Sequence, residues 1–173
     1  MRRTTQALTH ALIALVVEKR YDAITIQDLL QRADIVRSTF YAHYRSKDDL
    51  LLRSFERLLE RMDQAIDADA AGAGRLAPVR ELFQHVGEFQ AFHRRLAQAR
   101  VLDRLYQAGT DQLSRTIAGR LAARAPGAGG GAVPLPLAAR ARAGALFALL
   151  RWWVDHGAPY TPEQMDAMFH ALR

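Results

Sequence analysis

Apolar residues recur every three or four positions along most of this chain, the spacing that places them on one face of an α-helix. In the N-terminal part this pattern predicts helices over about 4–19, 26–33, 36–44 and 47–67. Beyond it, helices are expected over about 78–93, 94–107, 110–124, 137–156 and from about 162 onward. Strings of β-branched residues bounded by turns, which would indicate strands, are absent from the sequence. We therefore expect an all-α protein of about nine helices.

Capping signals support two of the N-terminal helix starts. Thr25 stands three residues before Asp28, a spacing at which the two side chains can form a capping box. Ser46 and Asp49 have the same spacing at the start of the long fourth helix. Only a very short turn, beginning at Asp34, is left between the second and third helices. Two short helices with so tight a turn, followed by a capped long helix, are typical of a helix-turn-helix.

Segments rich in small residues, Gly and Pro separate the later helices. Residues 68–77 and 125–136 are expected to be surface loops. Pro78 suits the first position of the helix that follows the first loop. Gly157 is expected to end the long C-terminal helix, and Thr161–Gln164 to cap the last one.

Composition narrows the class of protein. The chain has 173 residues, half of them apolar, and a net charge of +6, which suits an anionic partner such as nucleic acid. Residues 1–53 and 54–173 each carry +3, so bulk charge does not locate the binding surface. The absence of cysteine excludes disulfides and thiolate chemistry and fits a cytoplasmic location. The N-terminal apolar run reads as an amphipathic helix rather than a signal peptide, and no run approaches membrane-spanning length.

Candidate catalytic and metal-binding residues do not assemble into a known pattern. The six histidines are scattered, and His85 and His93 are about two helical turns apart, too far for a close metal pair. Gly127–Gly131 lacks the Lys-Ser/Thr of a phosphate loop. No nucleophile stands beside a base. We therefore expect no enzyme, no catalytic residue, no metal and no cofactor.

The segment Thr25–Leu52, TIQDLLQRADIVRSTFYAHYRSKDDLLL, closely resembles the helix-turn-helix of TetR-family regulators. The similar residues are Ser38-Thr39-Phe40-Tyr41, His43-Tyr44 and Ser46-Lys47-Asp48, and the resemblance covers about residues 4–60. Two positions depart from the family pattern. Asp34 stands where Gly is usual at the turn, and Val36 where a Ser or Thr usually caps the third helix. Asp tolerates left-handed backbone, whereas the lost cap is worth ~1 kcal/mol locally.

The third helix is expected to read the major groove with residues near its start. Arg37 can bind guanine, Thr39 a base or phosphate, and Ala42 a thymine methyl group. Phosphate oxygens are expected to be bound by Ser38, Tyr41 and His43, and at the starts of neighbouring helices by Thr25 and Lys47. Two alternatives without a DNA contact stay open. Arg37 and Lys47 could be solvated surface charges, and Tyr41 could be a partly buried core residue. Phe40 and Tyr44 are assigned to the core.

The resemblance also implies a division into a DNA-binding domain, residues 1–53, and a helical regulatory and dimerisation domain, residues 54–173. The segment LLRWWVDHGAPYTPEQMDAMF looks like the end of a TetR subgroup found in dihydroxyacetone-kinase regulators. In the family the last two helices pair with a second copy. The residues expected at that homodimer interface are Ala141, Ala145, Ala148, Trp153, Met165 and Phe169. Packing within the monomer core is the alternative for them.

An effector site is the least specific expectation. The resemblance implies an unknown small-molecule effector, and several aromatic residues of the middle and later helices could line its pocket: Phe83, Phe89, Phe92, Tyr106 and Trp152. His85, His93 or Arg95 could serve as polar anchors. Ordinary core packing is the alternative for the aromatic side chains.

These expectations describe a cytoplasmic, homodimeric repressor that binds a palindromic operator in double-stranded DNA and is released by the effector. Activation in place of repression stays open. A second interpretation also remains: a TetR-like coregulator that acts through protein–protein contacts and binds DNA weakly, because the third helix lacks its usual cap at Val36.

Overall fold

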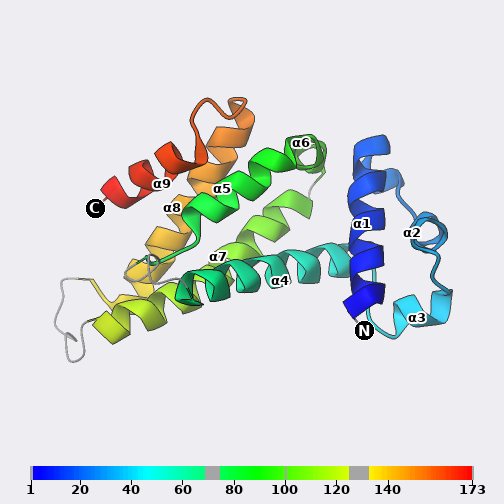
Figure 1. The fold of residues 1–173 in the computed structure, drawn as a ribbon, viewed down its shortest axis with the longest axis horizontal. Coiled ribbons are helices and arrows are strands. Elements are labelled where there is room, and N and C mark those ends of the chain that lie inside the picture. Colours follow the sequence, from blue (N-terminus) through cyan, green and yellow to red (C-terminus); the bar gives the residue numbers. More distant parts are fainter. Residues whose placement is uncertain (1, 69–74, 100, 125–132, 173) are drawn as a thin grey trace. The chain divides into compact units, whose positions relative to one another are not determined.

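A computed structural model describes residues 2–68, 75–99, 101–124 and 133–172. These described residues contain no strand (Figure 1). Their helices are α1 (Arg2–Glu18), a 3-10 helix η1 (Tyr21–Ala23), α2 (Ile26–Ala33), α3 (Arg37–Tyr41), α4 (Lys47–Ala68), α5 (Val79–Glu88), α6 (Gln90–Ala97), α7 (Val101–Arg124), α8 (Leu135–Asp155) and α9 (Pro162–Ala171). The expected all-α fold of about nine helices is confirmed.

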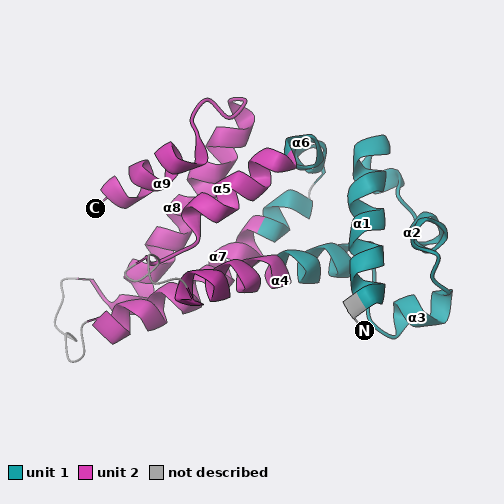
Figure 2. Ribbon diagram, viewed as in Figure 1, with its two compact units in different colours: residues 1–55, 90–105 teal, residues 56–89, 106–173 magenta. Residues whose placement is uncertain are grey.

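The chain divides into two compact units (Figure 2). Unit 1 consists of residues 1–55 and 90–105, and unit 2 of residues 56–89 and 106–173. The sequence predicts a domain boundary after residue 53, with residues 54–173 in one regulatory domain. In the structure, α6 and the first turn of α7 cluster with the N-terminal residues in unit 1.

Unit 1 is built around α1, which packs against α2 and α6. The predicted apolar face of α1 is buried, and Leu8 and Val16 are fully shielded from solvent. From the helix-turn-helix side, Leu29 of α2 and Phe40 of α3 are also fully buried. The short helices α2 and α3 therefore depend on tertiary packing for their stability, as helices of one or two turns do in general.

Unit 2 has a separate apolar core, to which α5, α7 and α8 contribute. Leu82 and Phe83 of α5, Leu113 and Ile117 of α7, and Leu146 of α8 are all fully buried. On the same unit α5 packs against α9. The segments 69–74 and 125–132, which make up most of the two expected loops, lie outside the described residues.

Two expected helix boundaries in the middle of the chain are wrong. The first break falls at Phe89, between α5 and α6, and not near residue 93. The second expected break, before residue 110, does not exist, because α7 runs continuously from Val101 to Arg124 with Gly109 inside it. A Cβ atom at Gly109 would collide with the ring of Phe147 on α8. This glycine therefore permits close approach of two helices and does not end one.

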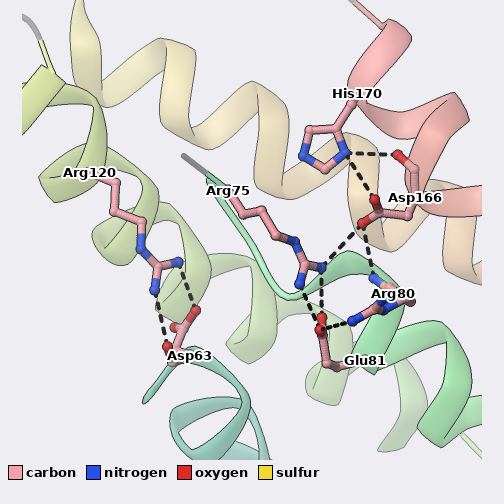
Figure 3. A network of polar contacts seen from close by, with 7 residues as sticks. All are labelled: Asp63, Arg75, Arg80, Glu81, Arg120, Asp166 and His170. Atoms are coloured by element: carbon pink, nitrogen blue, oxygen red, sulfur yellow. Dashed lines mark hydrogen bonds and ion pairs between the residues drawn. The ribbon is translucent and has the colours of Figure 1, made fainter. Parts of the chain in front are cut away.

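Ion pairs link the helices of unit 2 (Figure 3). Arg120 of α7 donates to the Asp63 carboxylate at 3.0 Å and to the Leu76 carbonyl oxygen at 3.0 Å. It also donates to Asp67 at 2.8 Å, so one guanidinium joins α7 to the last turns of α4. Burial raises the pKa of Asp63 above its ordinary value, and Arg120 opposes this shift. Within the described part of the chain, no helix is both long enough and apolar enough to cross a membrane.

Candidate nucleic-acid interface

The start of α2 carries the predicted capping box. Thr25 Oγ1 accepts from the Asp28 amide at 3.1 Å, and Asp28 Oδ2 accepts from the Thr25 amide at 2.7 Å. Lys19 of α1 lies 2.7 Å from the same carboxylate oxygen. Lys19 and the Thr25 donors hold the pKa of Asp28 well below its ordinary value. The predicted cap is confirmed, and the Thr25 hydroxyl is engaged in it.

The turn between α2 and α3 is made by Asp34. Its backbone is left-handed, with φ 53° and ψ 53°, and its amide donates back to the Leu30 carbonyl. This confirms that Asp adopts the conformation for which Gly is the usual residue. Only Ile35 and Val36 lie between Asp34 and Arg37, the first residue of α3.

Val36 occupies the cap position of α3. Its backbone has the extended geometry of an N-cap, and its carbonyl accepts from the amides of Thr39 and Phe40 at 3.1 and 3.3 Å. A valine side chain has no oxygen with which to cap the first turn. It is also 68% exposed, so its methyl groups lie in solvent. The helix thus forms without the side-chain cap, as the sequence predicted.

Two aromatic side chains anchor α3 and direct its other face outward. Phe40 is fully buried and Tyr44 nearly so, with ring centroids 5.7 Å apart. The Tyr44 hydroxyl donates to Thr5 of α1 at 3.2 Å. Tyr41 contacts Phe40 edge-on but is 51% exposed, which argues against a core role for it. Of the other predicted DNA contacts on or just after α3, the exposed ones are Arg37, Ser38 and Ala42, and the half-buried ones are Thr39 and His43.

Gln27 is a further candidate for a contact with DNA and was not among the residues predicted from the sequence. It lies in the first turn of α2, is exposed, and accepts from Arg37 Nη2 at 3.4 Å. The two side chains are therefore neighbours on the surface, although they come from different helices. Gln can bind adenine bidentately as Arg binds guanine, so the pair has the chemistry of base recognition. Its position between the cap residue and the buried Leu29 was the signal available in the sequence.

Lys47, for which a phosphate contact is predicted, lies close to three backbone carbonyl oxygens of the segment between α1 and α2. Its Nζ lies 2.7 Å from the Tyr21 carbonyl oxygen, 2.8 Å from that of Ile24 and 3.2 Å from that of Asp22. The ammonium is also 4.7 Å from the centroid of the Tyr21 ring. Burial lowers the pKa of Lys47, while neighbouring Asp48 and Asp22 oppose the shift. The three donors of the ammonium are directed at the chain's own backbone.

The neighbouring residue Asp48 also binds Tyr21. The Tyr21 hydroxyl donates to Asp48 Oδ1 at 2.6 Å, and Arg104 of α7 donates to Asp48 Oδ2 at 3.1 Å. Burial, followed by Asp48, raises the pKa of Tyr21 well above its ordinary value, so the hydroxyl keeps its proton. At the same helix start the Ser46 hydroxyl accepts from the Asp49 amide at 3.1 Å, the expected cap.

Comparison with known proteins identifies this domain. Residues 8–53 match the bacterial regulatory proteins described as the tetR family. The N-terminal unit of this chain therefore contains a DNA-binding domain of the tetR type. The matched residues include the helix-turn-helix formed by α2 and α3, and the family is described as one of bacterial regulatory proteins.

Two curated relatives match the N-terminal part of the chain. The HTH-type transcriptional regulator YxbF of Bacillus subtilis (strain 168) is 41% identical over 56 residues, which is 32% of this chain and 15% of YxbF. The transposon Tn10 TetC protein of Escherichia coli is 26% identical over 84 residues, 49% of this chain and 43% of TetC. The matches span less than half the length of either relative.

Solved structures extend the similarity in fold to almost the whole chain. The dihydroxyacetone kinase operon activator DhaS is 20% identical with a TM-score of 0.70, and the alignment covers 98% of this chain and 93% of DhaS. The fatty acid degradation regulator FadR of Bacillus halodurans is 15% identical with a TM-score of 0.66, and 96% of each chain is covered. The likeness to DhaS is consistent, at the level of fold, with the expected dihydroxyacetone-kinase-regulator subgroup.

Three of the residues expected at the homodimer interface lie in the core of unit 2. Trp153, Met165 and Phe169 are only 2%, 1% and 6% exposed. Trp153 Nε1 donates to the Tyr160 carbonyl oxygen at 2.8 Å, and its ring packs edge-on against Phe83. Their burial is what the alternative of packing within the monomer core predicts, and the interface role of these three residues stays a prediction. Ala141 and Ala148 are exposed and Ala145 is half-buried.

The residues expected to line an effector pocket differ in burial and in the rings that they contact. Phe83 is fully buried, and Tyr106 packs against Phe147 with ring centroids 5.5 Å apart. Trp152 is 41% exposed and stacks on His156 at 4.3 Å, so it belongs to the surface. Phe92 falls in unit 1, as do the anchor candidates His93 and Arg95.

Phe89 and His85, two of the expected residues, contact each other within unit 2. Phe89 is half-buried, and its ring centroid lies 4.8 Å from that of His85. Across the described residues no group of three or more His, Cys, Asp or Glu side chains could hold a metal ion.

Proposed function

We propose that this chain is a TetR-family transcription regulator, which binds a palindromic operator in double-stranded DNA as a homodimer, with α3 of each copy in a major groove. The observation that carries the proposal is the division of α3 into two faces. Phe40 fixes the helix to the core, while Arg37, Ser38 and Tyr41 are exposed beside one another. A reading helix needs this combination of a rigid inner face and a polar outer one.

The outward residues supply both kinds of contact that recognition requires. Arg37 has the donors for guanine O6 and N7, and Gln27 beside it has the donor and acceptor for adenine. Ser38, Tyr41 and His43 offer hydroxyl and ring N–H donors to phosphate oxygens, which set the register of the helix on the duplex. Thr39 and Ala42 complete the expected set, and the exposed Thr25 lies at the start of α2.

The dimer is proposed to form through the outer faces of α8 and α9. On α8 an exposed apolar row is formed by Leu137, Ala141, Ala148 and Trp152, and Gly144 and Ala145 between them are half-buried. On α9, Met168 is 42% exposed, and Leu172 directly after the helix is 58% exposed. Small residues allow two helices to approach closely, and exposed apolar rows of this length are unusual on a monomer. A second copy is the occupant that a two-fold operator requires.

Repression is the proposed outcome of operator binding in the cytoplasm, with release by a small-molecule effector bound in unit 2. His85 and Phe89 are the proposed contact pair for that effector, because an imidazole beside an aromatic ring combines a polar and an apolar contact. Release requires that the effector favour one of two conformations by differential affinity. DhaS is named an operon activator, so the direction of regulation needs its own measurement.

Selection of bound duplexes from a random DNA pool tests the proposal. We expect an enriched palindrome, and we expect Arg37→Ala to weaken binding and relax one position of each half-site by ~1–3 kcal/mol. Arg94→Ala is the control, since Arg94 is an exposed arginine of unit 1 on α6, outside the helix-turn-helix. An operator–reporter fusion then shows whether binding lowers or raises transcription. No enriched sequence at moderate salt would contradict the proposal.

The alternative is a coregulator that acts through protein–protein contacts, and the uncapped start of α3 at Val36 is the observation that favours it. The same selection separates the two functions. A coregulator would keep its dimer and its folded helices but bind all duplexes equally and weakly, with a steep dependence on salt.

A further inference from the structure

Lys47 makes three hydrogen bonds from a single nitrogen. The acceptors are the carbonyl oxygens of Tyr21, Asp22 and Ile24, at 2.7, 3.2 and 2.8 Å. An ammonium group has three donors and no acceptor, so its hydrogen-bonding capacity is filled by these contacts. A DNA phosphate could bind it only if one of the carbonyls were released.

The three carbonyls belong to the segment that joins α1 to α2. Tyr21 and Asp22 lie in the 3-10 helix η1, whose carbonyls converge at its C-terminal end. Ile24 directly precedes Thr25, the cap residue of α2. A positive charge at such a convergence of carbonyl dipoles is stabilising. Lys47 therefore fixes the backbone from which α2 starts.

Asp48, the next residue, holds the same turn from its other side. Its carboxylate accepts from the Tyr21 hydroxyl at 2.6 Å, while the Lys47 ammonium faces the Tyr21 ring at 4.7 Å. The first two residues of α4 thus contact the backbone carbonyl, the ring and the hydroxyl of one buried tyrosine, Tyr21. This contact ties the position of α2 to the start of α4.

We propose that Lys47 is a positioning residue, which holds the N-terminal turn of α2 and with it the Gln27–Arg37 pair, and that it does not neutralise a DNA phosphate. This inference rests on the proposed binding of operator DNA. In place of the expected contact between Lys47 and a DNA phosphate, it assigns to Lys47 a contact with carbonyl oxygens of its own chain. The two roles predict different results from the same substitutions.

Salt dependence separates a positioning role from a phosphate contact. A residue that neutralises one phosphate contributes about one unit to the slope of log K against log salt concentration. Lys47→Met retains most of the aliphatic stem and removes the charge. We expect it to weaken operator binding at least about tenfold with the salt slope unchanged, and to leave binding to random duplexes unchanged. A slope reduced by about one unit would overturn the proposal.

Lys47→Arg provides the second test. An arginine retains the charge, so it would support a phosphate contact. Its donors diverge around a planar group and cannot converge on three carbonyls as one ammonium does. We therefore expect Lys47→Arg to bind the operator as weakly as Lys47→Met. Operator affinity restored to that of the wild type by arginine would contradict the positioning role.

A measurement on the wild-type protein covers the case in which these variants do not fold. The chain has only two lysines, Lys19 and Lys47, so reductive methylation of each can be followed by mass spectrometry of peptides. We expect Lys47 to react much more slowly than a free lysine analogue, and at the same rate with and without operator DNA. Fast methylation of Lys47 in the free protein, or protection only by DNA, would refute the inference. If the wild-type protein shows no preference among DNA sequences, the proposed function is refuted. The methylation rate of the free protein still tests the contact of Lys47 with the three carbonyls.

Discussion

Asp166 on α9 accepts a hydrogen bond from the backbone amide of Arg80, 3.2 Å away and 86 positions earlier in the chain. Arg80 lies in the first turn of α5, whose cap position is occupied by Pro78. Proline has no side-chain acceptor, so α5 receives its N-terminal cap from another helix. Asp166 also lies 3.3 Å from Arg75 Nη2, and Arg75 pairs with Glu81 at 2.7 Å (Figure 3). One carboxylate thus joins α9 to the start of α5.

This relationship predicts the effect of two substitutions at Asp166. Asp166→Ala removes the cap and the ion pair and should lower the free energy of unfolding by about 1–3 kcal/mol, measured by urea denaturation. Asp166→Asn keeps an oxygen that can accept from the Arg80 amide but loses the charge. It should therefore lose less stability than the alanine variant. Equal losses for the two variants would show that the charge, and not the cap, is what matters.

Two glycines of α7 provide an opposed pair of substitutions. Gly109→Ala places a methyl group against the ring of Phe147, and overpacking of this kind should destabilise the protein by about 1–3 kcal/mol. An added Cβ at Gly119 meets no atom of the described residues within 4 Å. Gly119→Ala should therefore stabilise the helix by about 0.5–1 kcal/mol. Melting temperatures measured side by side check both, and a loss at Gly119 would contradict the open environment described for it.

Local chemistry explains what the sequence could predict. The capping boxes at Thr25 and Thr161 and the left-handed turn at Asp34 all occur, because each depends on residues within four positions of one another. The helix-turn-helix follows from the same short-range signals. The break expected before residue 110 does not occur, because Gly109 lies inside α7 and admits the Phe147 ring of α8, a contact that local sequence does not show.

Longer-range contacts explain what the sequence could not predict. Trp152 and Trp153 are adjacent on α8, and either could face the core until the packing of α5 and α9 is known. The structure buries Trp153, a predicted interface residue, and leaves Trp152, a predicted pocket residue, 41% exposed. Lys47 likewise has the position of a phosphate ligand in the sequence, but its acceptors lie more than 20 residues earlier.

The uncapped start of α3 predicts a stabilising substitution. Val36 already has the extended backbone of a cap residue and is 68% exposed, so Val36→Ser adds an acceptor with little loss of buried surface. We expect the free energy of unfolding to rise by about 1 kcal/mol. Val36→Ala, which adds no acceptor, is the control and should change stability little. An equal response to serine and alanine would argue against a capping effect.

The two tryptophans should respond differently to truncation. Trp153→Ala removes a ring that packs on Phe83 and donates to the Tyr160 carbonyl, and should cost about 3–5 kcal/mol of stability. Trp152→Ala should cost clearly less stability than Trp153→Ala, because Trp152 is 41% exposed and stacks on surface residues such as His156. If the proposed dimer forms through α8, Trp152→Ala should weaken association in sedimentation experiments. Unchanged association would exclude Trp152 from the dimer interface.

His85 should make unit 2 sensitive to mild acid. Burial lowers the pKa of His85 below its ordinary value of 6.5, Glu88 partly opposes this, and Arg61 adds to it. The unfolded state therefore binds a proton more readily than the folded state, and stability present above about pH 6.5 is lost as the pH falls through the folded pKa. The melting temperature of the wild type should fall between about pH 7.5 and pH 5.5 more steeply than that of His85→Gln. Identical curves for wild type and His85→Gln would contradict the assignment to His85.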